Sequence, residues 1–284
     1  MNDAKSYSPP VQINETMEGE CIAEIIESNH PDFSVGDIVV DRLGWASHGI
    51  SNGANAKKID KKLAHISTGL GVLGMPGLTA WVGLNDILNA KKGETLVVSA
   101  ATGAVGSLVG QLAKLKGLRV IGIAGGLEKN NYAIEELGYD TCIDHKVHDK
   151  DELREKISAA APNGIDCYFE NVGGEVTRAI APLLNKGSRV PVCGFISQYN
   201  EEDMLNAETP FHVLGKLKPK PKHRFFVVHE WVDEFEAATE LLSGYVSKGS
   251  IRYRETITKG FENAPQALRD VLSGKNFGKQ IIEI

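Results

Sequence analysis

The fold is decided by residues Thr95–Gly110, which read TLVVSAATGAVGSLVG. The apolar run Leu96–Val98 predicts a buried strand, the small residues after it predict a tight turn, and a helical pattern opens at Ser107. A strand, a glycine turn and a helix in this order form the dinucleotide-binding fingerprint, spelled here A-x-G-x-x-G with Ala101 at its first position. The stretch therefore predicts a nucleotide-binding βα unit, with a plain strand–helix turn as the alternative.

The two glycines of this turn have separate tasks. Gly103 lets the backbone approach a pyrophosphate closely, and Gly106 lets the helix pack tightly on the strand. The unpaired amides and the positive dipole end of the helix then face the phosphates. We therefore predict that the phosphates are bound by Gly103, Ala104, Val105 and Gly106.

The bulk composition is that of an ordinary globular protein. Of 284 residues, 42% are hydrophobic and 24% are charged, and the formal net charge is −6. No broad basic field is available for nucleic acid or for an anionic membrane. The polar first residues lack the apolar region of a signal peptide, and no apolar run is long enough to span a bilayer. We expect a cytoplasmic protein with neither a nucleic-acid nor a membrane partner.

Four cysteines lie far apart in the sequence, at Cys21, Cys142, Cys167 and Cys193. None forms a C-x-x-C pair, and no histidine cluster accompanies them, so we expect no metal site. Free thiols in a reducing compartment are the preferred interpretation.

Strand and helix patterns alternate after the fingerprint, which predicts an α/β fold with a Rossmann-type, doubly wound parallel sheet. The sequence predicts strands in this sheet at 96–99, 119–124, 141–144, 165–170 and 188–193, with helices at 107–116, 129–137, 150–160 and 175–184. Strand patterns at 19–26 and 38–42 indicate a β-rich beginning of the chain. For the end of the chain the sequence predicts a helix at 230–248, a strand at 253–258, a helix at 264–272 and a strand at 279–284. We place a β-rich domain at 1–70, the nucleotide-binding domain at 71–230, and a segment that returns to the first domain at 231–284.

The second strand of the unit indicates which dinucleotide is bound. An NAD site usually ends this strand with an acid, but here it ends Ala124-Gly125-Gly126, and Lys129 follows. An ammonium attracts the 2′-phosphate that a carboxylate would repel, so the sequence favours NADPH. Glu128 is compatible with either cofactor, and the alternative for Lys129 is a solvated lysine.

Six motifs in order carry a resemblance to a known family: GMPGLTAW (74–81), SAATGAVGSLVGQLAKLKG (99–117), AGGLEK (124–129), YFENVGGE (168–175), CGFISQYN (193–200) and GKNFGKQ (274–280). Together they resemble the zinc-independent branch of the medium-chain dehydrogenase/reductase superfamily, within it the NADPH-dependent alkenal double-bond, prostaglandin (leukotriene) and curcumin reductases. The resemblance implies that the β-rich beginning is a partial GroES-like domain. The family's first strands have no counterpart after Met1, so we expect an N-terminally truncated chain.

The resemblance also implies roles for individual residues. Lys129 matches the lysine that binds the 2′-phosphate, and His145 replaces a tyrosine that often contacts this group. The further residues that match cofactor contacts are Asn171, Cys193, Gly194, Phe195, Ile196, Ser197, Phe226, Val227, Val228 and Asn276. The basic stretch 216–224 departs from the family pattern, and we expect a solvated loop or an altered lid there.

The reaction that the resemblance implies is reduction of the C=C bond of an α,β-unsaturated aldehyde or ketone by a homodimer. NADPH delivers hydride to the β-carbon, and a hydrogen-bond donor stabilises the enolate. Tyr199 matches a family tyrosine beside the nicotinamide and is the expected catalytic residue; the cofactor ribose hydroxyl is the alternative donor, and a packing tyrosine is the alternative role. Quinone reduction and non-catalytic NADPH binding remain alternative functions.

Overall fold

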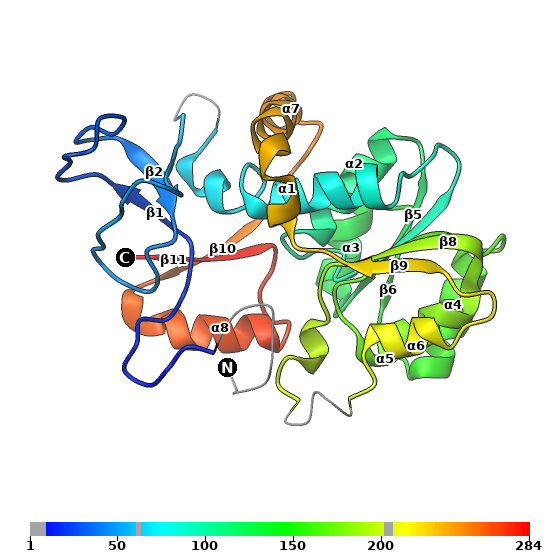
Figure 1. Cartoon of the computed structure of the whole chain (residues 1–284). Coiled ribbons are helices and arrows are strands. Elements are labelled where there is room, and N and C mark those ends of the chain that lie inside the picture. Colours follow the sequence, from blue (N-terminus) through cyan, green and yellow to red (C-terminus); the bar gives the residue numbers. More distant parts are fainter. Residues whose placement is uncertain (1–9, 61–63, 202–206) are drawn as a thin grey trace.

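The computed structural model describes residues 10–60, 64–201 and 207–284 of the chain. A six-stranded parallel sheet occupies one side of the molecule, on the right in Figure 1. Its strands have the spatial order β6-β5-β4-β7-β8-β9. The strands are β4 (Thr95–Ser99), β5 (Arg119–Ala124), β6 (Thr141–Asp144), β7 (Ile165–Phe169), β8 (Leu184–Val192) and β9 (Lys222–Phe225). The predicted Rossmann-type sheet is confirmed.

The strand order places a topological switch point between β4 and β7. The chain moves outward from β4 through β5 to β6, then crosses back to β7 and moves outward the other way. Loops that leave the carboxyl ends of these two central strands diverge, and open α/β sheets bind ligands at such a point.

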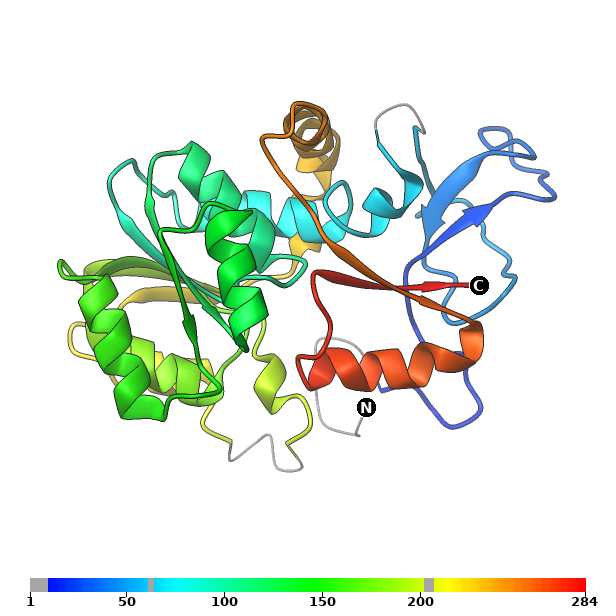
Figure 2. The same ribbon diagram turned by 180° about the vertical axis from the view of Figure 1, so that it is seen from behind.

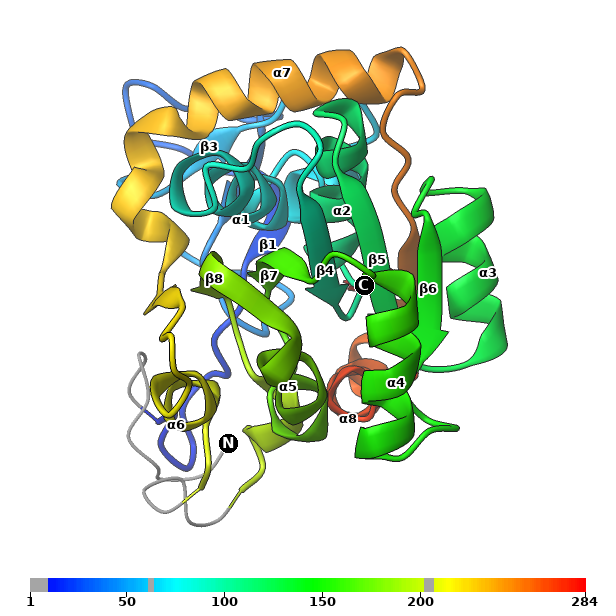
Figure 3. The same ribbon diagram turned by 90° about the vertical axis from the view of Figure 1, so that its right-hand side faces the viewer.

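Helices cover both faces of the sheet. Along β4, Leu96 and Val98 face one hydrophobic core and Val97 faces the other, because successive side chains of a strand point to opposite faces. Helices of the first core are α1 (Met75–Val82), α2 (Gly106–Leu115), α3 (Leu127–Glu135) and α7 (Phe235–Ser247); those of the second core are α4 (Lys150–Ala160), α5 (Gly174–Ile180) and α6 (Pro210–Gly215). Figure 3 shows α7 along the top and α4, α5 and α6 below the strands.

Two small sheets lie at the other end of the molecule. Strands β1 (Cys21–Glu24), β2 (Ile38–Asp41) and β3 (Lys57–Lys58) are antiparallel, whereas β10 (Glu255–Lys259) and β11 (Lys279–Glu283) are parallel and enclose α8 (Ala264–Leu272) in sequence. Figure 2 shows β10 and β11, orange and red, side by side and close to the blue N-terminal strands. Shorter helical turns occupy Ile66–Leu70, Gly83–Ile87, Ala181–Leu183, Ile196–Gln198, Val228–Glu234 and Phe261–Asn263.

The structure differs from the predicted elements on the β9 side. Five strands were expected, but Lys222–Phe225 of the basic stretch forms a sixth, so that part of the stretch is neither a loop nor a lid. An edge strand has one partner, here β8, and therefore tolerates exposed lysine and arginine side chains. Helix α6 was not predicted, and the long helix expected at 230–248 begins as a 3₁₀ turn with a kink at Trp231.

Candidate functional site

The glycine turn connects β4 to α2 and is very tight. The Gly103 N–H donates to Ala100 O at 2.9 Å, and the Ser107 N–H donates to Gly103 O at 3.0 Å. A Cβ at Gly106 would lie 2.2 Å from Ala100 O, so only glycine fits there. No side chain of the described residues caps the amino terminus of α2. This open helix end, reached through a turn without bulky side chains, fits a pyrophosphate.

A segment from the end of the chain runs beside this turn. The Gly278 N–H donates to Thr102 O at 3.1 Å, and Gly278 pairs with Gly103 as a parallel bridge. Asn276 belongs to this segment, and its Nδ2 donates to Gly278 O at 2.9 Å. The structure thus brings Asn276 next to the predicted phosphate site.

Lys129 and His145 come together at the carboxyl end of β5. A Cβ at Gly125 would lie 3.0 Å from His145 Nε2 and 2.7 Å from Cε of a second lysine, Lys146. The Lys129 Nζ donates to Gly274 O at 2.7 Å. Lys129 and Lys146 both act electrostatically on His145, so the two predicted residues are joined by a second lysine that was not predicted from the sequence.

Mutual repulsion within this basic cluster, defined as Lys129, His145 and Lys146, affects its titration. Burial lowers the pKa of Lys129, Lys146 lowers it further, and Glu128 partly opposes both. Burial also lowers the pKa of His145, with Asp144 opposing and the two lysines contributing. An anion placed here would relieve the repulsion, which fits a 2′-phosphate.

The turn after β7 and the segment after β8 form the other half of the site. The Asn171 Nδ2 donates to Ser99 O at 2.7 Å, and the Asn171 N–H donates to Ser99 Oγ at 2.8 Å. Across the gap to the next strand, the Ile196 N–H donates to Asn171 O at 3.1 Å and the Ser197 N–H to Val172 O at 3.0 Å. Asn171, Ile196 and Ser197 are thus brought together at the switch point.

Cys193, Gly194 and Tyr199 lie in the same segment. Burial raises the pKa of the Cys193 thiol to about 12, so the thiol stays neutral. The Tyr199 side chain is 38% exposed, and its ring packs edge-on against Phe195 with centroids 5.5 Å apart. A Cβ at Gly194 would lie 2.7 Å from the Tyr199 hydroxyl oxygen, so this glycine leaves room for that hydroxyl.

The segment after β9 contributes less through its side chains. Phe226 is 3% exposed and packs edge-on against Phe169 and Trp231, with centroid distances of 6.3 and 6.0 Å. Val228 is also buried in the core. Val227 is half-buried, so of Phe226, Val227 and Val228 it leaves the most side-chain surface accessible to a ligand.

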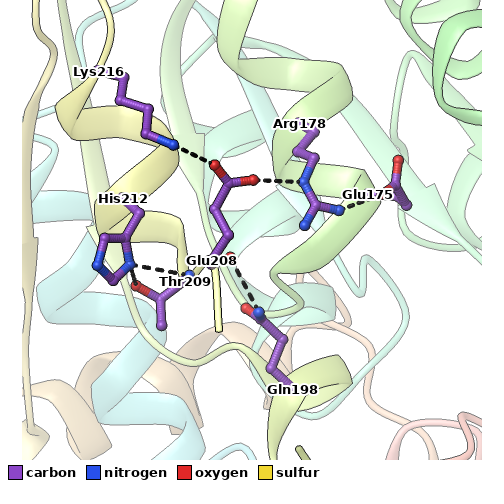
Figure 4. A network of polar contacts seen from close by, with 7 residues as sticks. All are labelled: Glu175, Arg178, Gln198, Glu208, Thr209, His212 and Lys216. Carbon is purple, nitrogen blue, oxygen red and sulfur yellow. Dashed lines mark hydrogen bonds and ion pairs between the residues drawn. The ribbon is translucent and has the colours of Figure 1, made fainter. Parts of the chain in front are cut away.

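A polar network holds α6 against α5 beside the segment after β8 (Figure 4). Glu208 accepts from Lys216 Nζ at 2.6 Å and from Arg178 Nε at 2.9 Å, and both cations lower the pKa of Glu208 to about 2. The Gln198 Nε2 donates to Glu208 O at 3.1 Å. The network therefore restrains the segment that carries Tyr199.

The ranges 10–60, 64–201 and 207–284 contain neither a cluster of metal ligands nor a helix that could span a membrane. Nowhere in them do three His, Cys, Asp or Glu side chains gather in a way that suits a metal ion. None of their helices combines the length and the apolar character that a membrane span requires.

Two protein families match the chain. One, described as the N-terminal domain of oxidoreductase, matches residues 1–59; the other, described as zinc-binding dehydrogenase, matches residues 104–242. NADPH-dependent curcumin reductase of Escherichia coli K12 is 45% identical over 287 residues, which cover 100% of this chain and 82% of that protein. Prostaglandin reductase 1 of the rat is 42% identical, with coverage of 95% and 82%, and the NADP⁺-dependent 2-alkenal reductase of tobacco is 36% identical, with coverage of 99% and 79%.

A solved structure agrees with these relatives. CurA from Vibrio vulnificus in complex with NADPH superposes with a TM-score of 0.92 at 46% identity, covering 99% of this chain and 84% of that one. Sequence identity and fold agree along nearly the whole chain. The chain therefore belongs to the zinc-independent medium-chain dehydrogenase/reductase family that includes the curcumin, prostaglandin and 2-alkenal reductases.

Proposed function

We propose that this protein uses NADPH to reduce the C=C bond of α,β-unsaturated aldehydes and ketones. The observation that carries the proposal is the two-part site at the switch point, with the basic cluster at the end of β5 and the turn of Asn171 at the end of β7. The names of the relatives, which include reductases of curcumin and of 2-alkenals, supply the substrate class.

Each part of the site has a task in this proposal. The open amino end of α2 binds the pyrophosphate, and the basic cluster binds the 2′-phosphate. The turn of Asn171 and the segment 193–197 hold the nicotinamide side. When bound, NADPH supplies a hydride for the β-carbon of the substrate.

Tyr199 is the proposed hydrogen-bond donor to the carbonyl oxygen of the substrate. Tyr199 is partly exposed, and its hydroxyl lies close to Gly194, at the end of the sheet where the nicotinamide side of the cofactor is expected. A donor at this oxygen stabilises the negative charge that develops when the β-carbon is reduced. The neutral thiol of Cys193 adds no charge to this region.

The test is NADPH consumption with a matched set of acceptors. We expect turnover with a 2-alkenal and with an enone, and none with the saturated aldehyde of the same length, because only the conjugated bond accepts hydride at the β-carbon. Faster turnover with a quinone than with every enone would replace the proposal by quinone reduction. NADPH binding without turnover of any acceptor would indicate a non-catalytic binding protein.

The family resemblance also leads us to propose a homodimer that works in the cytoplasm. One chain has a mass of 30.7 kDa, and sedimentation equilibrium of the purified protein should give twice that mass. A single-chain mass at micromolar concentration would contradict the dimer, and a fluorescent fusion found outside the cytoplasm would contradict the location.

A further inference from the structure

We propose that Glu170 is a positioning residue that holds the nicotinamide side of the cofactor site in shape. The proposal rests on the NADPH binding proposed above and adds a residue to which no task has been given. Glu170 follows β7 directly, and its side chain is 0% exposed. A ligand therefore does not reach it, and Glu170 acts through its neighbours.

The Glu170 carboxylate joins three elements that meet at the switch point. Its Oε1 accepts the N–H groups of Val172 at 2.7 Å and Gly173 at 3.0 Å, which form the turn of Asn171. The Ser99 hydroxyl at the end of β4 donates to the same oxygen at 3.1 Å. The Thr177 hydroxyl of α5 donates to Oε2.

The backbone of Glu170 adds β8 to this arrangement. Its N–H donates to Pro191 O at 3.1 Å. Its carbonyl oxygen accepts the N–H groups of Cys193 at 2.9 Å and Gly194 at 3.2 Å, which begin the segment that leads to Tyr199. One residue thus fixes the start of both segments proposed to hold the nicotinamide side.

The carboxylate and the turn depend on each other. A buried carboxylate is tolerated only when its oxygens are hydrogen-bonded, and here the donors come from the turn, from β4 and from α5. Gly173 and Gly174 have φ angles of 77° and 58°, a backbone conformation that other residues rarely adopt. The carboxylate bonds hold the turn on this unusual path.

The geometry of dinucleotide sites indicates which end of the cofactor senses Glu170. Such a cofactor lies across the switch point, with each half of the sheet holding one nucleotide. The basic cluster lies on the β5 and β6 half, and Glu170 lies on the β7 and β8 half. A change at Glu170 should therefore disturb the nicotinamide end and leave the adenosine 2′-phosphate end intact.

The test compares two carboxylate-to-amide substitutions, one within β7 and one directly after it. Glu170→Gln keeps the shape of the side chain but removes the negative charge to which the N–H groups of Val172 and Gly173 donate. Asp166→Asn is the matched control, because Asp166 accepts the Thr95 N–H at 2.9 Å and Asn185 Nδ2 at 2.8 Å at the opposite end of β7. Titration calorimetry with NADPH and with 2′,5′-ADP, which lacks the nicotinamide, measures both ends of the site.

For Glu170→Gln we expect the Kd of NADPH to rise about fivefold to tenfold and the Kd of 2′,5′-ADP to change less than about twofold. Asp166→Asn should lower the melting temperature comparably and leave both Kd values within about twofold. Unchanged NADPH binding by Glu170→Gln, or an equal loss of both ligands, would overturn the proposal. Failure of the unmodified protein to bind NADPH would overturn the proposed function itself.

A second pair of variants keeps the test valid if Glu170→Gln does not fold. Thr177→Val removes the hydroxyl that donates to Glu170 Oε2, whereas Thr177→Ser keeps it. We expect the NADPH affinity to fall in Thr177→Val and to be retained in Thr177→Ser, again with 2′,5′-ADP binding unchanged. Equal behaviour of the two variants toward NADPH would contradict the positioning role.

Discussion

At the scale of single residues, the basic cluster should decide the choice between NADPH and NADH. If the cluster binds the 2′-phosphate as proposed, removing the ammonium in Lys129→Ala or Lys146→Ala takes one charge-assisted contact from that group. We expect the Kd of NADPH to rise about tenfold to hundredfold in each variant, while NADH binding is unchanged. Fluorescence titration with both nucleotides measures this ratio.

The control for the two lysines is Lys156→Ala, an exposed lysine on α4. It changes the net charge by the same amount without touching the cluster, and it should leave both affinities as they are. If Lys129→Ala weakened the binding of NADPH and of NADH equally, the basic cluster would not be the binding site of the 2′-phosphate. If Lys129→Ala raised the Kd of NADPH and Lys146→Ala did not, only Lys129, the lysine predicted from the sequence, would contribute to binding the 2′-phosphate.

His145 should make the protein less stable in acid. Burial lowers the pKa of this histidine in the folded chain, so the unfolded chain binds a proton first as the pH falls below about 6.5. Stability is therefore lost as the pH falls from 7.5 toward 5.5, and His145→Gln should lose less over this range. Melting temperatures at both pH values measure the difference, with exposed His229→Gln as control. Identical pH dependence of His145→Gln and the unmodified protein would contradict the assignment.

Tyr199 should affect the chemical step more than cofactor binding. Tyr199→Phe keeps the ring that packs against Phe195 and removes only the hydroxyl. Loss of one donor to a developing oxyanion lowers kcat on the order of a hundredfold, while the Kd of NADPH should stay the same. Steady-state kinetics with an enone and calorimetry with NADPH separate the two effects. An unchanged kcat would assign the hydrogen bond to another donor.

At the scale of elements, the contact between β4 and α2 should tolerate no side chain at Gly106. A Cβ there would lie 2.2 Å from the Ala100 carbonyl oxygen, which is a backbone atom and cannot rotate away, and the position of the Cβ is itself fixed by the backbone of residue 106. We expect Gly106→Ala to lower the free energy of unfolding by about 1–3 kcal/mol and to weaken NADPH binding. Urea unfolding and calorimetry measure both effects.

The same substitution at Gly244 is the control and should have the opposite sign. Gly244 lies inside α7, and apart from the neighbouring backbone of that helix no atom of the described residues stands within 4 Å of an added Cβ. Gly244→Ala should therefore stabilise the protein by about 0.5–1 kcal/mol, since alanine is the better helix former. Destabilisation by both variants would indicate a general sensitivity of the helices instead of a specific close approach at Gly106.

How far the sequence predicts a strand depends on how apolar its residues are. The buried strands β4, β5 and β7 have a partner on both sides, and their apolar runs marked them clearly. The edge strand β9 reads KHRF, and pairing with β8 alone does not require an apolar pattern. Its position became clear only from the pairing.

Contacts across the sheet were equally hidden from the sequence. The glycine turn and Lys129 were predicted because local spacing and charge identify them. Lys146 was missed because its relevance depends on β5 and β6 ending side by side. The bonds of Ser99 to the turn of Asn171 depend on the strand order, which no local pattern encodes.

At the scale of the whole molecule, the end of the chain from Glu255 onward connects the other parts. The segment before β11 bonds to the glycine turn through Gly278, and the Lys129 ammonium bonds to Gly274 O. At the start of β10, Glu255 Oε2 accepts the Ser67 hydroxyl at 2.8 Å from the N-terminal side of the molecule. Residues 255–278 thus contact both the proposed cofactor site and Ser67 on the N-terminal side.

The bond between Ser67 and Glu255 should therefore stabilise the assembly of these parts. Ser67 is 9% exposed, and the second carboxylate oxygen of Glu255 is buried without a hydrogen-bond partner among the described residues. Ser67→Ala leaves that carboxylate with one donor fewer, so we expect a coupling energy of about 1–2 kcal/mol in a double-mutant cycle with Glu255→Ala, which removes the acceptor. Urea unfolding of the four proteins measures it. If the losses of unfolding free energy in the two single variants added up to the loss in the double variant, the two side chains would stabilise the protein independently and the bond between them would contribute nothing.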